Sequence, residues 1–418
     1  MNKGFLGPSP ARVIRVIAVF LAIACTGCDG GRDAADNGVF GLIQPGDLTY
    51  LGAFRLPETD TGDEVASWAY GGQALTYRYS GDASGPDDGF PGSLIGCGHA
   101  WEHRVSEVTI PVPVVSTGKD VDDLPSAITL QAFTDILRVS DLEIPRAGLG
   151  FLAHSNVERL YFCYGAHFQN GGEGTHGCCG LDFSTPNMRR GWFVDCPHNV
   201  YNTNDYMFEI PADWADRHIP GMRLVSGRFR DGGWSGQGPS LVALEPWGIV
   251  DLPPGSALTH VTLLMYASSE DEGGGSGVMD LYHHSDEWSG GVWLSTSDKG
   301  AVVFVGTKGI GDCWYGDRDG PCLECAGERG WWSSGFEGWF LFYDPADLAE
   351  VAAGRMAPGE PQPYAHLWVD EFLYHVESTQ QKAHLGAASF DPERGLLYVL
   401  EPLADANKPL VHVWRIGG

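Results

Sequence analysis

Five pairs of short apolar runs recur along this chain of 418 residues. In each pair the first run begins at glycine and alternates between apolar and polar residues, and a second apolar run follows it. The first runs are GGQALTYRY (71–79), GLGFLAHS (148–155), GPSLVALE (238–245), GGVWLSTS (290–297) and GAASFDPE (386–393). The second runs are GSLIGCGH (92–99), ERLYFCYG (158–165), THVTLLMYA (259–267), GAVVFVGT (300–307) and GLLYVLEP (395–402). Period-two alternation is typical of β-strands, so each pair predicts two neighbouring strands.

The spacing of these pairs predicts a β-propeller. The first runs begin 77, 90, 52 and 96 residues apart, which leaves room for a four-stranded blade except in the short third interval. Candidate outer strands are VSEVTIPVP with AITLQAFTDI, DYMFEIP with MRLVSGRF, and WFLFYDP with PYAHLWVD. We therefore expect one all-β propeller of five blades, or of six or seven if some of these segments each contain two blades.

The last blade lacks a fourth strand within its own segment. LVHVWRI, near the C-terminus, supplies only a third strand after the final pair. LTYLGAFRLP (48–57) can supply the fourth and so close the ring, which removes an exposed sheet edge.

The N-terminus predicts export. Lys3, Arg12 and Arg15 precede the apolar run VIAVFLAIA (16–24), which is too short to span a bilayer. The ending Thr26-Gly27-Cys28 resembles the lipobox of bacterial lipoproteins, in which the cysteine is lipidated. Cys25 is the rival, and plain cleavage remains an alternative because neither cysteine has leucine three residues upstream. We expect an export signal over 1–27, a flexible tether over 28–46 and the propeller over 47–418, in a lipid-anchored protein of the bacterial cell envelope (periplasm or outer surface).

Charge limits the partners of such a protein. The formal net charge is −28, and without residues 1–27 the chain keeps 54 acidic side chains against 23 basic ones. This surface repels nucleic acid and anionic lipid. We expect a polar small molecule or a glycan as the partner, no nucleic acid, and membrane contact through the lipid anchor alone.

Two long loops predict a cysteine-rich face. In a propeller the loops from the second to the third strand and from the outermost to the next innermost strand share one face, the top face. The loops 166–204 and 308–338 both belong there and hold three cysteines each. These disulfide candidates are Cys178, Cys179, Cys196, Cys313, Cys322 and Cys325. Oxidising conditions outside the cytoplasm favour one bridge in each loop and a third between them, whereas Cys97 and Cys163 are expected to be free and buried.

Metal binding is the alternative for these loops. The CxxC at 322–325 could bind zinc with Cys313 and a histidine. The DRDG at 317–320 resembles part of a calcium loop but lacks the later glutamate, so a turn is favoured. The cofactor is therefore unknown from the sequence, with zinc or calcium as candidates.

Three histidines are predicted at the same face. GCGHAW and CYGAHF end equivalent strands with His99 and His167, and His384 precedes the last innermost strand. Three imidazoles with an oxygen from Glu102, Glu401 or Asp231 would suit a catalytic zinc site. The competing interpretation is that each histidine is separately hydrogen-bonded at a loop entrance.

Tryptophans are concentrated in these predicted top loops. They are Trp68, Trp101, Trp192, Trp234, Trp314, Trp331 and Trp332, half of the chain's 14. Exposed indole rings beside polar groups can stack on sugar rings. We take Trp68, Trp101, Trp234, Trp331 and Trp332 as candidate ligand-binding residues, while the alternative is that the rings pack the loops together.

These observations support three classes of function. The leading hypothesis is binding of a neutral carbohydrate or similar polar ligand at the top face. The competing class is an enzyme at the same mouth, either a metal-assisted hydrolase using the three histidines or a glycosidase using two carboxylates. The catalytic candidates are Glu102, Glu401, Asp231 and Glu337. The third class is a disulfide-braced envelope scaffold that binds a protein partner.

Overall fold

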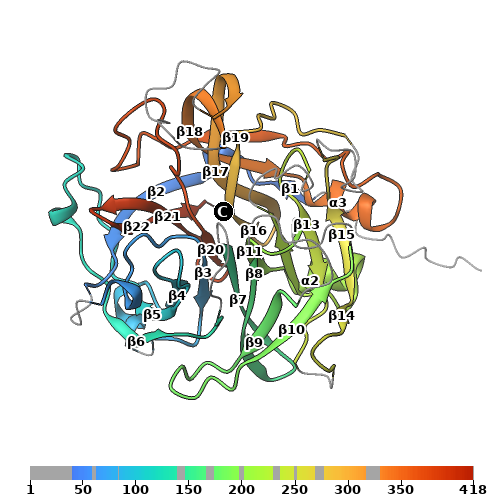
Figure 1. Ribbon diagram of the computed structural model, residues 1–418, viewed down its shortest axis with the longest axis horizontal. Helices are drawn as coiled ribbons and strands as arrows, with labels where there is room; N and C mark the ends of the chain where they lie inside the picture. Colours follow the sequence, from blue (N-terminus) through green and yellow to red (C-terminus); the bar gives the residue numbers. More distant parts are fainter. Residues whose placement is uncertain are drawn as a thin grey trace, which may run out of the picture. The chain divides into compact units, whose positions relative to one another are not determined.

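The computed structural model describes residues 40–58, 63–82, 84–138, 146–165, 174–196, 202–228, 236–248, 252–268, 277–316 and 330–417. The unit from Phe40 onward consists of five mainly antiparallel sheets arranged around a central axis, with short parallel edge strands in two of them (Figure 1). The prediction of a five-bladed, all-β propeller is therefore confirmed. The described residues contain two α-helices, α2 (Ala212–His218) and α3 (Pro345–Ala352). The predicted export signal and Cys28 lie outside the described residues.

Each blade is built from four principal strands, named in order from the axis outward. Blade 1 has β3 (Leu75–Arg78), β4 (Ser93–Cys97), β5 (Val105–Thr109) and β6 (Thr129–Thr134). Blade 2 has β7 (Arg146–His154), β8 (Val157–Gly165), β9 (His176–Cys179) and β10 (Arg189–Val194), and β14 (Ala257–Leu258) is added at its edge. Blade 3 has β11 (Tyr206–Glu209), β12 (Leu224–Gly227), β13 (Leu241–Leu244) and β15 (His260–Leu264).

The remaining two blades contain the longest strands. Blade 4 has β16 (Glu287–Ser295), β17 (Lys299–Tyr315), β18 (Trp331–Tyr343) and β19 (Ala365–Trp368), and β1 (Gly41–Leu42) pairs with the start of β17. Blade 5 has β20 (Ala388–Asp391), β21 (Leu396–Asp405), β22 (Lys408–Ile416) and β2 (Leu48–Arg55). The short 3-10 helices are η1 (Pro45–Asp47), η2 (Glu64–Ala66), η3 (Gly85–Asp88) and η4 (Val121–Asp123).

Strand β2 closes the ring, as predicted. It pairs antiparallel with β22, from Leu48 opposite Ile416 to Arg55 opposite Leu410. A bulge lies between Tyr50 and Gly52. Strand β2, near the start of the described chain, thus completes blade 5, which also contains the last strand, β22.

The hydrophobic core consists of five layers, one between each pair of neighbouring blades. The layer between blades 5 and 1 contains Phe54 and Tyr398 against Leu94, all with little or no solvent exposure. Alternating side chains on each strand point to the two faces of a blade, so every strand serves two layers. This arrangement explains why nearly every residue of an inner strand such as β4 is buried.

The prediction for blade 3 was wrong. GPSLVALE and THVTLLMYA were expected as its two innermost strands, but they form the outer strands β13 and β15. DYMFEIP and MRLVSGRF, expected at the edge of blade 2, form the innermost strands β11 and β12. The short third interval of 52 residues came from this misassignment, because it counted from an outer strand.

Neither long top loop is the connection that the sequence predicted. The segment 166–204 contains strands β9 and β10 of blade 2. In the segment 308–338, β17 and β18 continue beyond the blade as a paired extension as far as Tyr315 opposite Trp331. Residues 41–47, assigned mostly to the tether, contain β1 and η1. No helix among the described residues is long and apolar enough to cross a membrane.

Candidate functional site

A cavity of about 210 Å³ lies at the end of the axis where the innermost strands begin, which we call the top mouth. Blades 1, 2, 4 and 5 supply its walls. The lining residues are Tyr70, Gly71, Gly72, Gln73, Arg146, Glu287, Ser289, Ala383, Leu385, Gly386, Pro402 and Leu403. The volume is below the roughly 300–1,000 Å³ of pockets for drug-sized ligands, so it suits one small ring or the end of a longer ligand.

Besides Tyr70, four residues of this lining have polar side chains. Arg146 is the first residue of β7, and Glu287 is the first residue of β16. Gln73 and Ser289 add an amide and a hydroxyl. Opposite charges with neutral donors and acceptors can hydrogen-bond to a neutral, hydroxyl-rich ligand without requiring a net charge on it.

Aromatic rings stand at the rim of the top mouth. Tyr70 is 49% exposed, and its ring makes an edge contact with His99 at 5.8 Å between centroids. The backbone amide of Trp101 donates to His99 Nδ1 at 3.4 Å, and the Trp101 side chain is 58% exposed. Tyr70 has a φ of 54° and is held there by a hydrogen bond from its amide to the Asn407 carbonyl at 2.6 Å. The rim therefore offers the exposed ring of Tyr70 beside His99, and the exposed Trp101 follows His99 in the chain.

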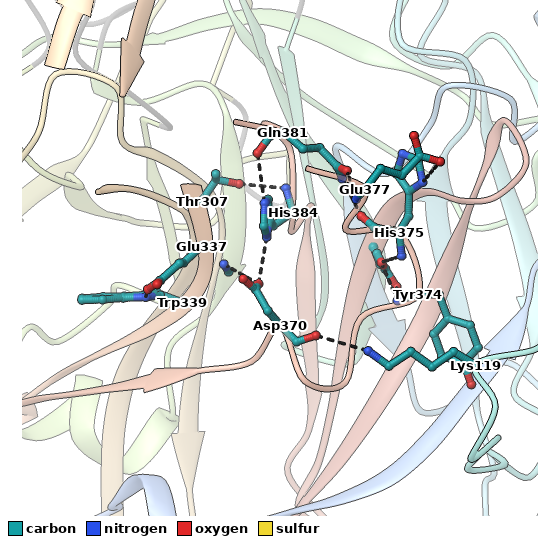
Figure 2. Close-up of polar contacts among 12 residues, drawn as sticks. Lys119, Thr307, Glu337, Trp339, Asp370, Tyr374, His375, Glu377, Gln381 and His384 are labelled. Carbon is teal, nitrogen blue, oxygen red and sulfur yellow. Dashed lines mark hydrogen bonds and ion pairs between the residues drawn. The ribbon is translucent and has the colours of Figure 1, made fainter. Parts of the chain in front are cut away.

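His384 is a buried structural residue (Figure 2). Its Nδ1 lies 2.8 Å from Asp370 Oδ1, and its Nε2 lies 3.0 Å from the Gln381 carbonyl oxygen. Its backbone amide donates to Thr307 Oγ1 at 2.9 Å. Because both ring nitrogens are engaged with acceptors, the side chain has no nitrogen left to bind a metal. Asp370 Oδ1 also accepts from the Gly338 amide.

Glu401 is also held within a network. It accepts hydrogen bonds from the amides of Tyr374 and His375 and lies 2.7 Å from His412 Nε2. Tyr50 Oη lies 2.9 Å from His412 Nδ1. Glu401 is 1% exposed, so its carboxylate fixes the 374–375 segment to blade 5 and does not face the cavity.

The other candidate carboxylates are dispersed. Glu337 Oε2 accepts from Trp339 Nε1 at 2.8 Å on β18. Glu102 lies in the turn after β4, where its amide donates to the His99 carbonyl. Neither of these lines the top mouth. Asp231 lies outside the described residues, so its predicted role stays a prediction.

The predicted tryptophans occupy different environments. Trp68 is 1% exposed and packs against Phe133 at 5.0 Å, so its faces are covered by protein. Trp332 is buried beside Phe336, and Lys382 Nζ lies 4.3 Å from its ring centroid. Trp331 stacks on His284 at 4.4 Å. Trp101 is open to solvent, and Trp234 lies outside the described residues.

The structure corrects the disulfide prediction. The six described cysteines are free: Cys97, Cys163, Cys178, Cys179, Cys196 and Cys313. Cys178 and Cys179 are neighbours in β9, so they point to opposite faces of blade 2 and enter different core layers. Burial raises the pKa of Cys178 to about 11 and the pKa of Cys179 to about 12, which keeps both as neutral thiols. Cys97 and Cys163 are buried and free, as expected, and Cys322 and Cys325 lie outside the described residues.

The described residues give no support to a metal centre. Within them no group of three His, Cys, Asp or Glu side chains could hold a metal ion. His384 is hydrogen-bonded at both nitrogens, and His99 accepts from the Trp101 amide. His167 lies outside the described residues, and its predicted role stays a prediction.

Sequence reasoning missed most of the cavity lining. Arg146 and Glu287 lie just before the runs used to find the innermost strands, and Gln73 lies within one of them. Tyr70 lies in SWAYGG, a segment noted for its tryptophan. The usable signal was positional, because residues at the start of an innermost strand face the top of the axis.

No protein-family model matches the chain, and no curated protein matches it. Among solved structures, it is similar to the β-propeller domain of Cps50 (Swd1) from Myceliophteria thermophila, with 8% identity, coverage of 88% of this chain and 99% of that chain, and a TM-score of 0.30. It is also similar to the PQQ domain of pyranose dehydrogenase from Coprinopsis cinerea, with 10% identity, coverage of 86% and 98%, and a TM-score of 0.34. At these TM-scores the likeness carries no argument about function.

Proposed function

We propose that this propeller binds a neutral carbohydrate, or a similar polar ligand, at its top mouth. The observation that carries the proposal is the cavity whose polar lining joins a rim of exposed aromatic rings. The hydroxyls of a sugar would bond to Gln73, Arg146, Glu287 and Ser289, and its apolar face would stack on Tyr70. Trp101 would extend the contact to a second sugar unit.

Binding of a defined set of neutral oligosaccharides to the purified protein tests the proposal by calorimetry. We expect Tyr70→Ala to weaken binding by about tenfold, since loss of one stacked ring removes about 1 kcal/mol or more. Tyr79→Ala is the matched control, because Tyr79 is 50% exposed but follows β3 at the opposite end of the blade. Equal affinity of the two variants would refute the proposed site.

The same titration separates binding from catalysis. A glycosidase would release reducing ends from the bound oligosaccharide, whereas a binding protein returns it intact. Loss of such a release in Glu287→Gln would convert the proposal into an enzymatic one, with Glu287 as a carboxylate at the mouth.

We also propose export and lipid anchoring at Cys28, supported by the N-terminal residues. Cys28→Ser should move the full chain from the membrane fraction to the soluble fraction after cell breakage. Cys25→Ser should leave it at the membrane. The reverse pattern would assign the anchor to Cys25, and a soluble wild type would exclude the anchor.

A further inference from the structure

A second cavity, of about 270 Å³, lies at the opposite end of the axis, which we call the bottom mouth. The innermost strands of all five blades reach it, and each blade contributes one aromatic residue to the lining. These residues are Tyr77, Phe151, Phe208, Trp293 and Phe390. Four of them are buried, and Phe390 is partly open.

One carboxylate projects into this aromatic surround. Glu209 ends β11 and is the only described lining residue with a carboxyl or basic side chain. In the described part of the chain it makes no hydrogen bond and no ion pair; the nearby Arg223 donates to Asp216. Glu209 is exposed to solvent at the mouth, and the surrounding walls reduce the hydration of its carboxylate and raise its pKa to about 7.

We propose that the bottom mouth binds an organic monocation, either a quaternary ammonium group or a protonated amine. Glu209 would supply the opposite charge, and the aromatic lining would receive the apolar substituents of the cation. This proposal goes beyond the top-mouth function and does not depend on it.

The lining disfavours a metal ion. Calcium takes about six to eight oxygen ligands, and magnesium needs near-octahedral coordination. Two hydroxyls of the lining already accept backbone hydrogen bonds: Thr76 Oγ1 from the Phe151 amide at 2.8 Å, and Ser389 Oγ from the Tyr77 amide at 2.7 Å. A single carboxylate with apolar walls suits a large, weakly hydrated cation better.

The charge of the whole chain favours the same occupant. A formal net charge of −28 attracts cations to the surface. A neutral apolar molecule would instead cover the Glu209 carboxylate and leave it without a partner, which is costly.

Calorimetric titration of the full chain with choline chloride and with tetramethylammonium chloride at pH 8 tests the proposal. We expect saturable binding that Glu209→Gln weakens by about tenfold. Glu371→Gln removes the same charge from an exposed position outside the lining and should leave binding unchanged. Phe390→Leu, which keeps an apolar side chain, should weaken binding severalfold. Absence of saturable binding, or equal binding by the wild type and Glu209→Gln, would overturn the proposal.

The pH dependence provides a second test. Choline keeps its charge at every pH, so its affinity should follow ionisation of Glu209 and rise about tenfold from pH 6 to pH 8. Arg223 and Tyr79 are the other ionisable groups that interact with Glu209. Tyr77 lines the mouth with Asp391 and Arg394 beside it, and Glu158 and Glu393 lie near Tyr79. Glu209→Gln should abolish the rise. Persistence of the rise in this variant would assign it to another group and overturn the role of Glu209.

Discussion

His176 is an uncharged imidazole enclosed between blades 2 and 3. Its Nδ1 lies 3.0 Å from Thr175 Oγ1, its Nε2 lies 3.4 Å from Ser226 Oγ, and its ring meets the Trp247 ring edge-on at 5.6 Å between centroids. Burial removes the hydration that the charged form needs and lowers the pKa of His176 to about 3. In the unfolded chain the pKa of histidine is about 6.5. Folding therefore opposes protonation of this residue.

The consequence is a loss of stability in mild acid. The contribution of His176 is fully present above pH 6.5 and is lost as the pH falls toward 3, because only the unfolded chain takes up the proton. Between pH 8 and pH 5 this amounts to about 2 kcal/mol in the free energy of unfolding. Urea unfolding at the two pH values should show that His176→Gln is less stable at pH 8 but loses about 2 kcal/mol less on acidification. Identical pH dependence in the variant would refute this assignment.

At the scale of elements, closure of the ring by β2 is the connection on which blade 5 depends. Phe54 on this strand is fully buried between blades 5 and 1, whereas Thr49 on the same strand is exposed. Gly52 has a φ of 121°, and an added Cβ there would lie 2.3 Å from the backbone of Val114. The strand therefore tolerates change only on its outer side.

Substitutions on the buried and exposed sides of β2 should have different effects on stability. Phe54→Ala should lower the free energy of unfolding by about 3–5 kcal/mol through the cavity it leaves. Thr49→Ala should change it by less than about 0.5 kcal/mol. Thermal or urea unfolding measures both, and a small effect of Phe54→Ala would mean that blade 5 remains folded without a well-packed β2.

The sequence predicted which segments form strands better than it predicted where those strands lie in the blades. The apolar runs identified the innermost strands of blades 1, 2, 4 and 5 and the closing strand. They could not assign blade 3, since β13 alternates as regularly as an innermost strand. Strand β9 has only four residues, and its two cysteines suggested a loop. The top mouth was beyond prediction because Arg146 and Glu287 meet only through the ring arrangement.

At the scale of the molecule, the two mouths should respond differently to salt. The acidic surface attracts a cation to the bottom mouth through interactions that salt screens over about 10 Å at 0.1 M. A neutral sugar at the top mouth gains nothing from this field. Raising sodium chloride from about 20 mM to about 500 mM should therefore weaken choline binding and leave oligosaccharide binding nearly constant. Calorimetry in both buffers checks this, and equal salt dependence at the two mouths would contradict it.

The pairing of β2 with β22 also determines how the molecule responds to mechanical force. Leu48 begins one strand and Ile416 ends the other, and they lie opposite each other at the same end of the pair. Tension applied between residue 48 and residue 416 would act across the strands and break their hydrogen bonds one after another, starting at that end. A ring that is closed through several hydrogen bonds and a fully buried core layer would thus open like a zipper, at a much lower pulling force than strands loaded in shear.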